Sequence, residues 1–377
     1  MRKIQMVDLK SQYEKIKKEI DSAILNVIES TAFINGPEVK NFQLDLEKYL
    51  GVKHVIPCAN GTDALQVSMM ALNLKPGDEI IAPSFTFVAT AEVIALLGLT
   101  PVLVDADPDT FNIDPKAIEK AITPKTKAIV PVHLFGQCAD MDAIMDIATK
   151  HNLTVIEDTC QAIGAEFISK NGTKKKAGTI GHIGCTSFFP SKNLGCYGDG
   201  GAIFTNDDAI AEKIRIIVNH GMTVRYYHDL IGVNSRLDSI QASILKIKLK
   251  RLDEYAVARN NAATYYDNAF RGNPKLKTPV RFNKSTHVFH QYTLVTNGFD
   301  RVKLIEYLQE KGIPAMIYYP VPMHMQKAYQ DPRYKVGDFP VTEALAKSVI
   351  SLPMHTELDD EQLNHITGSI LEFINIS

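Results

Sequence analysis

The chain has 377 residues, of which 45% are hydrophobic and 22% are charged. This composition is typical of a globular protein with enough apolar side chains for one large domain and a smaller one, and it excludes a disordered chain. The formal net charge of -2 offers no basic field that would attract a nucleic acid, so we expect a protein that acts on small molecules.

The N-terminal residues Met1–Asp8 lack the apolar core of a secretory signal, and no uninterrupted apolar stretch is long enough to cross a bilayer. We therefore expect a cytoplasmic protein without a membrane partner. An amphipathic helix is expected next, over Ser11–Glu29.

Short apolar strands then alternate with helical stretches. The expected strands are His54–Pro57, Glu79–Pro83, Pro101–Val104, Ala128–Val132, Leu153–Glu157, Cys185–Phe189 and Ala202–Phe204. The expected helices, with apolar residues at three- and four-residue spacing, are Thr62–Leu74, Thr86–Leu97 and Met141–Lys150. Strands separated by helices predict an α/β fold with a largely parallel sheet covered by helices on both faces.

A dense basic run, Lys174–Lys176, lies between Asn171-Gly172 and Gly178 and is interpreted as a solvated hairpin tip. From about Arg251 the pattern changes. A long helix is expected first. It is followed by two expected strands, His290–Val295 and Pro314–Tyr319, and by two expected helices, Arg301–Lys311 and Asp359–Ile374. This change predicts a large domain over residues 1–250 and a smaller α+β domain over residues 251–377.

The five cysteines lie mostly in or beside apolar runs, with no pair at zinc-ligand spacing. We interpret them as reduced core residues and expect no metal site. They are Cys58, Cys138, Cys160, Cys185 and Cys196.

Ligands of open α/β sheets bind beyond the carboxyl ends of the strands, so the residues that follow each strand are the candidates for chemistry. The first such segment is Cys58–Leu65, where a strand passes through Gly61 into a helix. The free N–H groups and the dipole of that helix could hold a phosphate. A simple capped turn is the alternative, since the segment lacks the full glycine pattern of a P-loop.

The second segment places two acids, Glu157 and Asp158, directly after an apolar strand. Because side chains alternate along a strand, only one of them can face a ligand, and Asp158 is our choice. A carboxylate beside a heteroaromatic nitrogen keeps that nitrogen protonated, as the pyridine ring of pyridoxal phosphate (PLP) requires. A helix N-cap is the alternative role for Asp158.

The third segment, Cys185–Gly201, contains Lys192 after an apolar strand and among several glycines. A neutral amine at this place could form a Schiff base. Free lysine has a pKa of about 10.4, so this chemistry needs a site that disfavours the ammonium form, and Phe188–Pro190 could provide a dry wall. A solvated surface lysine is the alternative.

The fourth segment is Gly232–Asp238, which leads into an expected helix over Ser239–Leu249. Arg236 could clamp a carboxylate with its planar guanidinium, and Asn234 could bond a phosphate oxygen. A surface pair of Arg236 with Asp238 is the alternative.

Five motifs, in this order along nearly the whole chain, resemble those of the DegT-type nucleotide-sugar aminotransferases. They are Asn60–Leu65, Ala82–Thr90, Glu157-Asp158 with Gln161, Ser187–Asn193 and Gly198–Gly201. The resemblance implies the fold of the fold-type I PLP-dependent transferases, with PLP as cofactor. It also implies a homodimer in which each active site is completed by the partner subunit.

The resemblance implies roles around the cofactor ring. Lys192 would bind PLP as a Schiff base, and Asp158 would pair with the pyridine nitrogen. Phe87 would stack on the ring, and Gln161 would lie near the ring hydroxyl.

It also implies roles at the phosphate and at the substrates. Arg236 would meet carboxylates of the amino donor and the sugar, which favours glutamate as the donor. The segment with Tyr318, Tyr319 and His324 would border the sugar nucleotide. The residues expected at the phosphate are Gly61, Thr62, Ser187 and, from the partner subunit, Asn234.

Within the family, the segments Ser187–Asp207, Gly232–Asp238 and Ser351–His355 are most similar to enzymes that act on a UDP-linked 3-oxo-N-acetylglucosaminuronate. The resemblance thus implies transfer of an amino group from L-glutamate to the C3 ketone of this UDP-sugar, leaving 2-oxoglutarate, in bacterial surface polysaccharide (O-antigen) biosynthesis. Two alternatives stay open: another 3- or 4-keto UDP or dTDP sugar, and a PLP-binding regulatory protein without turnover. The related sugar dehydratases typically carry His in place of the lysine, which argues against dehydration.

Overall fold

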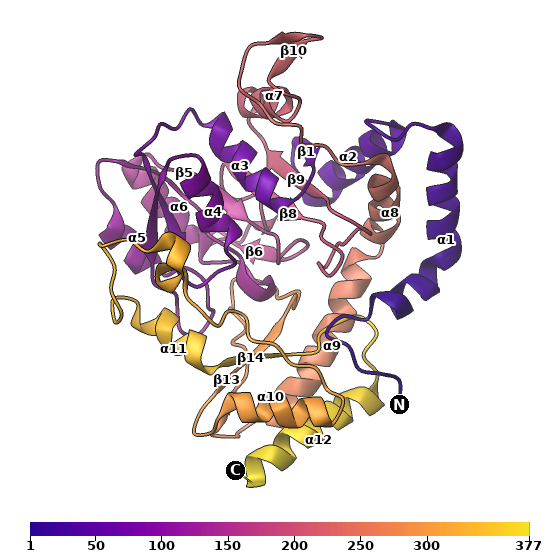
Figure 1. Cartoon of the computed structure of the whole chain (residues 1–377), viewed down its shortest axis with the longest axis vertical. Coiled ribbons are helices and arrows are strands. Elements are labelled where there is room, and N and C mark those ends of the chain that lie inside the picture. Colours follow the sequence, from indigo (N-terminus) through magenta and orange to yellow (C-terminus); the bar gives the residue numbers. More distant parts are fainter. Residues whose placement is uncertain (377) are drawn as a thin grey trace.

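A seven-stranded sheet forms the centre of the structure, a computed structural model that describes residues 1–376 (Figure 1). The strand order is β1-β9-β8-β5-β4-β2-β3, and all neighbours are parallel except β9, which runs antiparallel to β1 and β8. The seven expected strands and the predicted fold class are confirmed. The strands are β1 (His54–Cys58), β2 (Glu79–Pro83), β3 (Thr100–Val104), β4 (Thr126–Ile129), β5 (Thr154–Asp158), β8 (Ile183–Ser187) and β9 (Gly201–Thr205).

Helices cover both faces of this sheet because its strands are buried on both sides. In β2, Ile80 and Ala82 pack into the hydrophobic cluster of one face, and Ile81 packs into that of the other. The first face is covered by α3 (Gly61–Ala71), α4 (Ala89–Leu96) and α7 (Asp208–Ile217). The second is covered by α2 (Pro37–Leu50), α5 (Pro115–Ala121), α6 (Met141–His151) and α8 (Ser239–Leu249), with α1 (Leu9–Ser30) beside α8 (Figure 1).

Two local expectations around the large sheet were wrong. Helix α4 begins at Ala89 instead of Thr86, because Ser84 is bound by its N–H to the Val104 carbonyl and the chain continues as a loop that carries Phe87. The basic run forms strand β7 (Lys174–Lys176), paired with β6 (Glu166–Ile168), so the hairpin tip lies at residues 169–173.

The C-terminal part is built on a three-stranded antiparallel sheet, β12-β13-β14, below the large sheet in Figure 1. The expected strand Pro314–Tyr319 was wrong: only Met316 forms a bridge, to Ser351. The elements are α9 (Leu252–Phe270), β12 (Leu276–Lys277), β13 (Tyr292–Thr296), α10 (Arg301–Glu310), α11 (Pro340–Ser348), β14 (Val349–Leu352) and α12 (Asp360–Ile376). Short 3₁₀ helices are η1 (Leu134–Gly136), η2 (Met323–Met325) and η3 (Lys327–Tyr329).

The N-terminal residues pack on this C-terminal part. Ile4 is buried in its core, and the Met354 N–H donates to the Met6 carbonyl. A small hairpin, β10 (Met222–Val224) with β11 (Tyr227–His228), projects from the opposite end of the molecule (Figure 1). The domain boundary at residue 250 stays a prediction.

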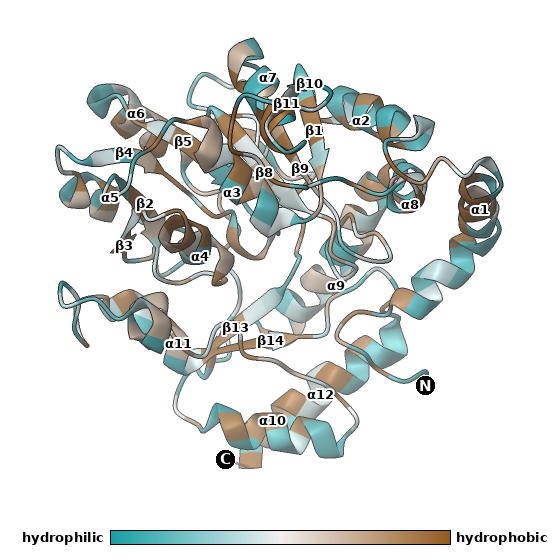
Figure 2. Ribbon diagram, turned by 45° about the horizontal axis from the view of Figure 1, so that its top comes forward, coloured by the Kyte–Doolittle hydropathy of each residue, from teal (hydrophilic) through white to brown (hydrophobic). Residues whose placement is uncertain are grey.

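Helix α4 is largely hydrophobic, whereas α1 carries both hydrophobic and hydrophilic turns (Figure 2). Among the helices of residues 1–376, none combines the length and the apolar composition needed to cross a bilayer. All five cysteines are unpaired, and four of them are buried; Cys160 is partly exposed.

Candidate active site

A cavity of about 610 Å³ lies at the carboxyl ends of β1, β2, β4, β5 and β8. The topology brings these strand ends to one edge of the sheet, where ligands of such folds bind. Of the twelve expected site residues, those that line the cavity are Gly61, Thr62, Phe87, Asp158, Gln161, Ser187, Lys192, Tyr318 and Tyr319.

One end of the cavity is formed by the N-terminus of α3. The Asn60 side-chain oxygen caps this helix by accepting the Asp63 N–H at 2.8 Å. In the described part of the chain, the amide N–H groups of Gly61 and Thr62 have no acceptor. Free donors at the positive end of a helix dipole bind anions, so this end of the cavity can hold a phosphate.

Gly61 allows β8 to approach the start of α3 closely. A Cβ atom at this position would lie 2.7 Å from the Ser187 Cβ and 2.9 Å from the Cys160 Sγ. Because real Cβ contacts are longer than this, only glycine permits the observed distance between the helix N-terminus and Ser187.

Asp158 ends β5 and presents its carboxylate to the cavity. Its Oδ1 accepts the Cys160 N–H at 3.1 Å, and its Oδ2 accepts the Thr90 hydroxyl at 3.2 Å. These two bonds fix the orientation of the carboxylate. Thr90 was missed as a site residue, although it lies in the same motif, Ala82–Thr90, as Phe87.

Glu157 points away from the cavity, as the alternation of side chains along a strand predicts. Its Oε2 lies 2.8 Å from the His133 Nε2 and accepts the Gly178 N–H at 2.9 Å. The His133 Nδ1 accepts the Ala139 N–H, so the ring proton is on Nε2, which donates to Glu157. The contact between Glu157 and His133 thus stabilises the end of β5 on the side of the strand opposite to the Asp158 carboxylate.

Lys192 borders the cavity, and protein encloses its amine. Burial lowers its pKa, while Cys160 and Asp158 oppose this shift. A lowered pKa increases the neutral fraction of the amine, which is the form that attacks carbonyls and removes protons. The segment Phe188–Pro190 was expected to form an apolar wall beside Lys192. Only Phe189 of this segment lines the cavity, since Phe188 is fully buried in the core.

Gln161 and two aromatic residues form the side of the cavity that faces the C-terminal part. The Gln161 Oε1 accepts the Phe135 N–H at 2.7 Å, and its Nε2 donates to the Tyr319 hydroxyl at 3.0 Å. Burial raises the pKa of Tyr319, which stays protonated at neutral pH. Phe87 is 54% exposed, and its ring centroid lies 6.1 Å from that of Tyr319, which leaves ring surface free for a planar ligand.

Three expected residues lie elsewhere. The His324 Nδ1 lies 2.8 Å from the Ser84 Oγ, and its Nε2 lies 3.3 Å from the Glu343 Oε1, so both ring nitrogens are engaged outside the cavity. Asn234 is exposed. Arg236 has no ion-pair or hydrogen-bond partner among residues 1–376, so the surface pair with Asp238 does not form.

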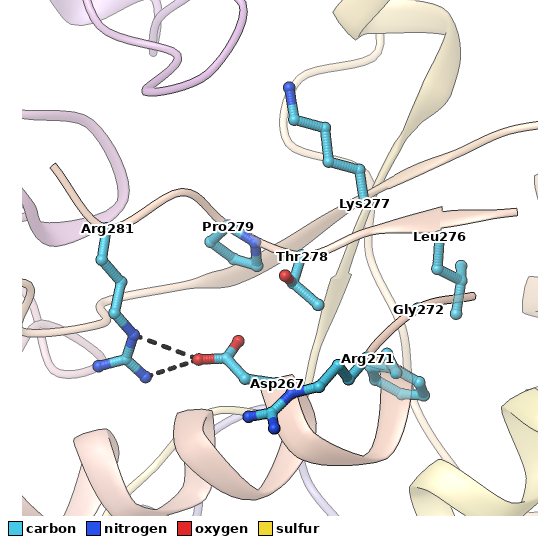
Figure 3. A pocket seen from close by; sticks show the side chains of 9 residues that line it. Asp267, Arg271, Gly272, Leu276, Lys277, Thr278, Pro279 and Arg281 are labelled. Carbon is cyan, nitrogen blue, oxygen red and sulfur yellow. Dashed lines mark hydrogen bonds and ion pairs between the residues drawn. The ribbon is translucent and has the colours of Figure 1, made fainter. Parts of the chain in front are cut away.

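A second hollow, of about 470 Å³, lies in the C-terminal part (Figure 3). Its charges are paired with one another or with neighbours: Arg281 binds Asp267 at 2.8 Å, and Lys277 points away to Asp109. It contains no nucleophile beside a base, so the chemistry belongs to the cavity at the sheet edge.

The groups around that cavity fit PLP. Free amide N–H groups suit its phosphate, a buried carboxylate suits its ring nitrogen, and an amine of lowered pKa lines the same cavity. Within residues 1–376 there is no group of three His, Cys, Asp or Glu side chains that could hold a metal ion.

Comparisons with known proteins agree with this geometry. The model of the DegT/DnrJ/EryC1/StrS aminotransferase family matches residues 14–371. The chain is 47% identical over 372 residues to a protein of Geobacillus stearothermophilus named pleiotropic regulatory protein, covering 98% of each chain. It is 46% identical over 367 residues to the UDP-2-acetamido-2-deoxy-3-oxo-D-glucuronate aminotransferase of Pseudomonas aeruginosa, covering 97% of this chain and 99% of that one.

Among solved structures, NtdA of Bacillus subtilis with bound cofactor PMP aligns with a TM-score of 0.88 and 33% identity, over 96% of this chain and 82% of that one. Family model, relatives and structure all extend over nearly the whole chain. The protein therefore belongs to the DegT/DnrJ/EryC1/StrS family: it is a nucleotide-sugar aminotransferase with the fold-type I architecture, and its cofactor is PLP.

Proposed function

We propose that the protein transfers the amino group of L-glutamate to the C3 ketone of UDP-2-acetamido-2-deoxy-3-oxo-glucuronate. The observation that carries this proposal is the 46% identity over 97% of the chain to an aminotransferase of that name, in a chain whose cavity contains both Lys192 and Asp158. Glutamate becomes 2-oxoglutarate, and the C3 carbonyl becomes an amine. The product is a precursor for bacterial surface polysaccharide.

The residues of the cavity have different roles in this proposed reaction. PLP, when bound, supplies an electron sink for the carbanions of both half-reactions. Asp158 stabilises the protonated ring nitrogen, because a carboxylate beside it favours the charged form. The neutral amine of Lys192 removes the proton from the glutamate Cα and delivers a proton to C3 of the sugar.

Other residues bind and orient the ligands. The α3 amide N–H groups and Ser187 hold the phosphate of PLP, Phe87 covers its ring, and Gln161 lies near its hydroxyl. Arg236, which is free of protein partners in the described chain, is available to bind carboxylates of glutamate and of the uronate. Tyr318 and Tyr319 border the sugar nucleotide; for His324 we propose an indirect role through Ser84.

We also propose that the protein is a homodimer with shared active sites. Asn234 is exposed and lies outside its own cavity, at the end of the segment that begins with the projecting β10–β11 hairpin. Val224, Tyr226 and Ile231 of that segment are 62%, 77% and 89% exposed. Such apolar exposure is typical of an interface, and a second copy would cover it and receive Asn234 at its PLP phosphate.

An absorbance measurement tests the substrate. PLP-loaded protein is mixed with UDP-2-acetamido-3-amino-2,3-dideoxyglucuronate, the amino sugar from which the reaction runs backwards. We expect loss of the band of lysine-bound PLP and appearance of the pyridoxamine form, and recovery on adding 2-oxoglutarate. The matched control is the corresponding glucose derivative, which lacks only the carboxylate. An equal response to both would leave the aminotransferase assignment intact and overturn the uronate specificity.

A regulatory protein without turnover is the rival that one observation favours, namely the name of the Geobacillus relative. The two differ in the fate of the amino group. Catalytic amounts of the protein should convert an excess of amino sugar and 2-oxoglutarate; conversion of at most one equivalent would favour the regulator.

A further inference from the structure

A second lysine, Lys248, is buried beside the segment that carries Lys192. Its side chain lies in α8 and is 1% exposed. Its Nζ donates to the Gly195 carbonyl at 2.7 Å, the single hydrogen bond of this amine within the described chain. The same Nζ lies 4.9 Å from the centroid of the Tyr197 ring. Both contacts are made to the loop of residues 188–200, which we call the lysine loop.

The surroundings of Lys248 make its charge costly. Apolar residues such as Leu194, Leu245 and Leu249 belong to the same buried cluster as this part of α8. Burial lowers the pKa of Lys248 to about 8, and Cys196 opposes the shift, so the amine is still mostly protonated at neutral pH. A charged hydrogen bond and a cation–π contact offset this cost. A methionine would fill similar space without the cost of burying a charge. The specific contribution of Lys248 is therefore the pair of contacts that its amine makes with the loop.

The lysine loop is compact, so the contacts of Lys248 with Gly195 and Tyr197 also restrict the position of Lys192. The Lys192 N–H donates to the Phe189 carbonyl at 2.8 Å. A Cβ on Gly195 would lie 2.3 Å from the Pro190 carbonyl oxygen, so the two limbs of the loop touch through their backbones. A displacement of Gly195 must therefore move the residues around Lys192 as well.

Helix α8 supports the same loop at a second point. The Gln241 side-chain oxygen accepts the Tyr197 N–H at 2.8 Å. Gln241 and Lys248 are seven residues apart, which places them on one face of the helix two turns apart. The helix itself is fixed by packing of Ala242 and Leu245 in the core with α2, so it provides a rigid support.

We propose that Lys248 is a positioning residue, which fastens the lysine loop to α8 and thereby sets the place of the Lys192 amine in the cavity. The inference rests on the proposed role of Lys192 as the reacting amine, but its first readout does not depend on turnover.

The experiment compares Lys248→Met with Lys248→Arg, which retains a donor and a charge. Lys246→Met is the matched control: it lies on the same helix, and its amine binds Glu38 at 3.1 Å, away from the loop. In Lys248→Met we expect amide hydrogen exchange at Lys192, Cys196 and Tyr197 to accelerate about tenfold, as loss of a charged hydrogen bond predicts. We expect the bound PLP to dissociate faster by a similar factor, about tenfold. In Lys248→Arg, the exchange rates and the rate of PLP dissociation should lie close to those of the unchanged protein. Lys246→Met should change neither the exchange rates nor the PLP dissociation.

Unchanged exchange in the lysine loop of a folded Lys248→Met protein would overturn the proposal, and so would an acceleration spread evenly over the core, which indicates a merely structural role. If Lys248→Met does not fold, Lys248→Leu, which also lacks a hydrogen-bond donor, replaces it under the same criteria. Exchange is measured on protein without substrate. A failure of the sugar assay therefore affects the proposed function and leaves this test standing.

Discussion

At the scale of the residue, the chemistry depends on two opposing influences on Lys192. Burial favours its neutral form, whereas the nearby Asp158 favours the ammonium, and burial is the larger of the two. In the proposed mechanism the Asp158 carboxylate stabilises the cofactor ring, although the same charge raises the pKa of the Lys192 amine. The two residues are thus coupled, and substituting either should have a distinct signature.

Replacement of Lys192 with alanine removes the amine that we propose as the proton carrier. We expect turnover to fall by at least about 10²–10⁴-fold, the range typical of a lost general base. PLP should still bind without a covalent bond, which absorbance and borohydride trapping can distinguish. Undiminished turnover in this variant would exclude Lys192 as the base.

Asp158→Asn retains the shape of the side chain and removes its charge. Because the ring nitrogen then loses its stabilising partner, we expect turnover to fall by about 10²-fold or more, with little change in the melting temperature. Glu157→Gln is the matched control one residue earlier. It leaves buried backbone N–H groups poorly satisfied and should cost about 1–3 kcal/mol of stability with a smaller effect on rate. The reverse pattern would assign the functional carboxylate to Glu157.

At the scale of the element, the phosphate end of the cavity depends on how closely α3 approaches β8. In Gly61→Ala the new methyl group would meet Ser187 and Cys160 at less than 3.0 Å, so the helix start must move away from the strand. We expect PLP affinity to fall at least about tenfold and stability to fall by about 1–3 kcal/mol. Titration with PLP and urea unfolding measure the two effects.

The control for this substitution is Gly368→Ala in α12, where a Cβ would meet nothing within 4 Å. There the helix should gain about 0.5–1 kcal/mol, since alanine favours helix more than glycine does. Equal PLP affinity in Gly61→Ala and the unchanged protein would show that the phosphate binds elsewhere.

The elements differed in how far the sequence could predict them. The seven strands of the large sheet were predictable because burial on both faces requires continuous apolar runs. The segment Pro314–Tyr319 is just as apolar, but its first residue, Pro314, cannot donate to a ladder, and only Met316 pairs. Helices α2 and α5 were missed even though each carries a proline at its first turn, a helix-start signal.

The same reasoning applies to the site. Asp158 and Lys192 could be brought together from the sequence, because each follows a strand and parallel strand ends share one edge of the sheet. His324 could not be placed, since its partners Ser84 and Glu343 come from distant parts of the chain and no local pattern encodes that contact. Lys248 was missed for the same reason: its acceptor, Gly195, lies in another segment.

At the scale of the whole molecule, buried histidines, among them His287 and His355, make stability depend on pH. Burial lowers the pKa of His287 to about 3 and that of His355 to about 4. In the unfolded chain both have a pKa near 6.5, so on acidification the unfolded state takes up protons first. Above about pH 6.5 these two histidines do not reduce the free energy of unfolding. As the pH falls from about 6.5 toward 4, the free energy of unfolding decreases by up to about 3 kcal/mol for each histidine.

Urea unfolding at a series of pH values measures this loss. In His355→Gln the slope of stability against pH should decrease by about one proton between pH 6.5 and 4, because the uncharged amide takes up none. The exposed His228→Gln is the control. An identical slope in His355→Gln and the unchanged protein would mean that this histidine titrates alike in both states.

The largest unit is the proposed dimer, and two inactive variants can test it together. Lys192→Ala destroys the amine, and Asn234→Glu places a carboxylate where we propose that Asn234 meets the PLP phosphate. If Asn234 acts on the partner's site, a heterodimer of the two variants contains one site with both changes and one site with neither. Tandem purification of differently tagged subunits should then recover about half of the wild-type turnover per dimer.

If Asn234 acts within its own subunit, each site of that heterodimer carries one lesion, and no activity returns. The assay therefore separates a shared site from two independent ones without a structure of the complex. It also has an internal control, because each homodimer is inactive alone, and activity can only arise from their combination. Recovery near one half would connect the exposed hairpin segment, which has no evident role in a single chain, to the chemistry at Lys192.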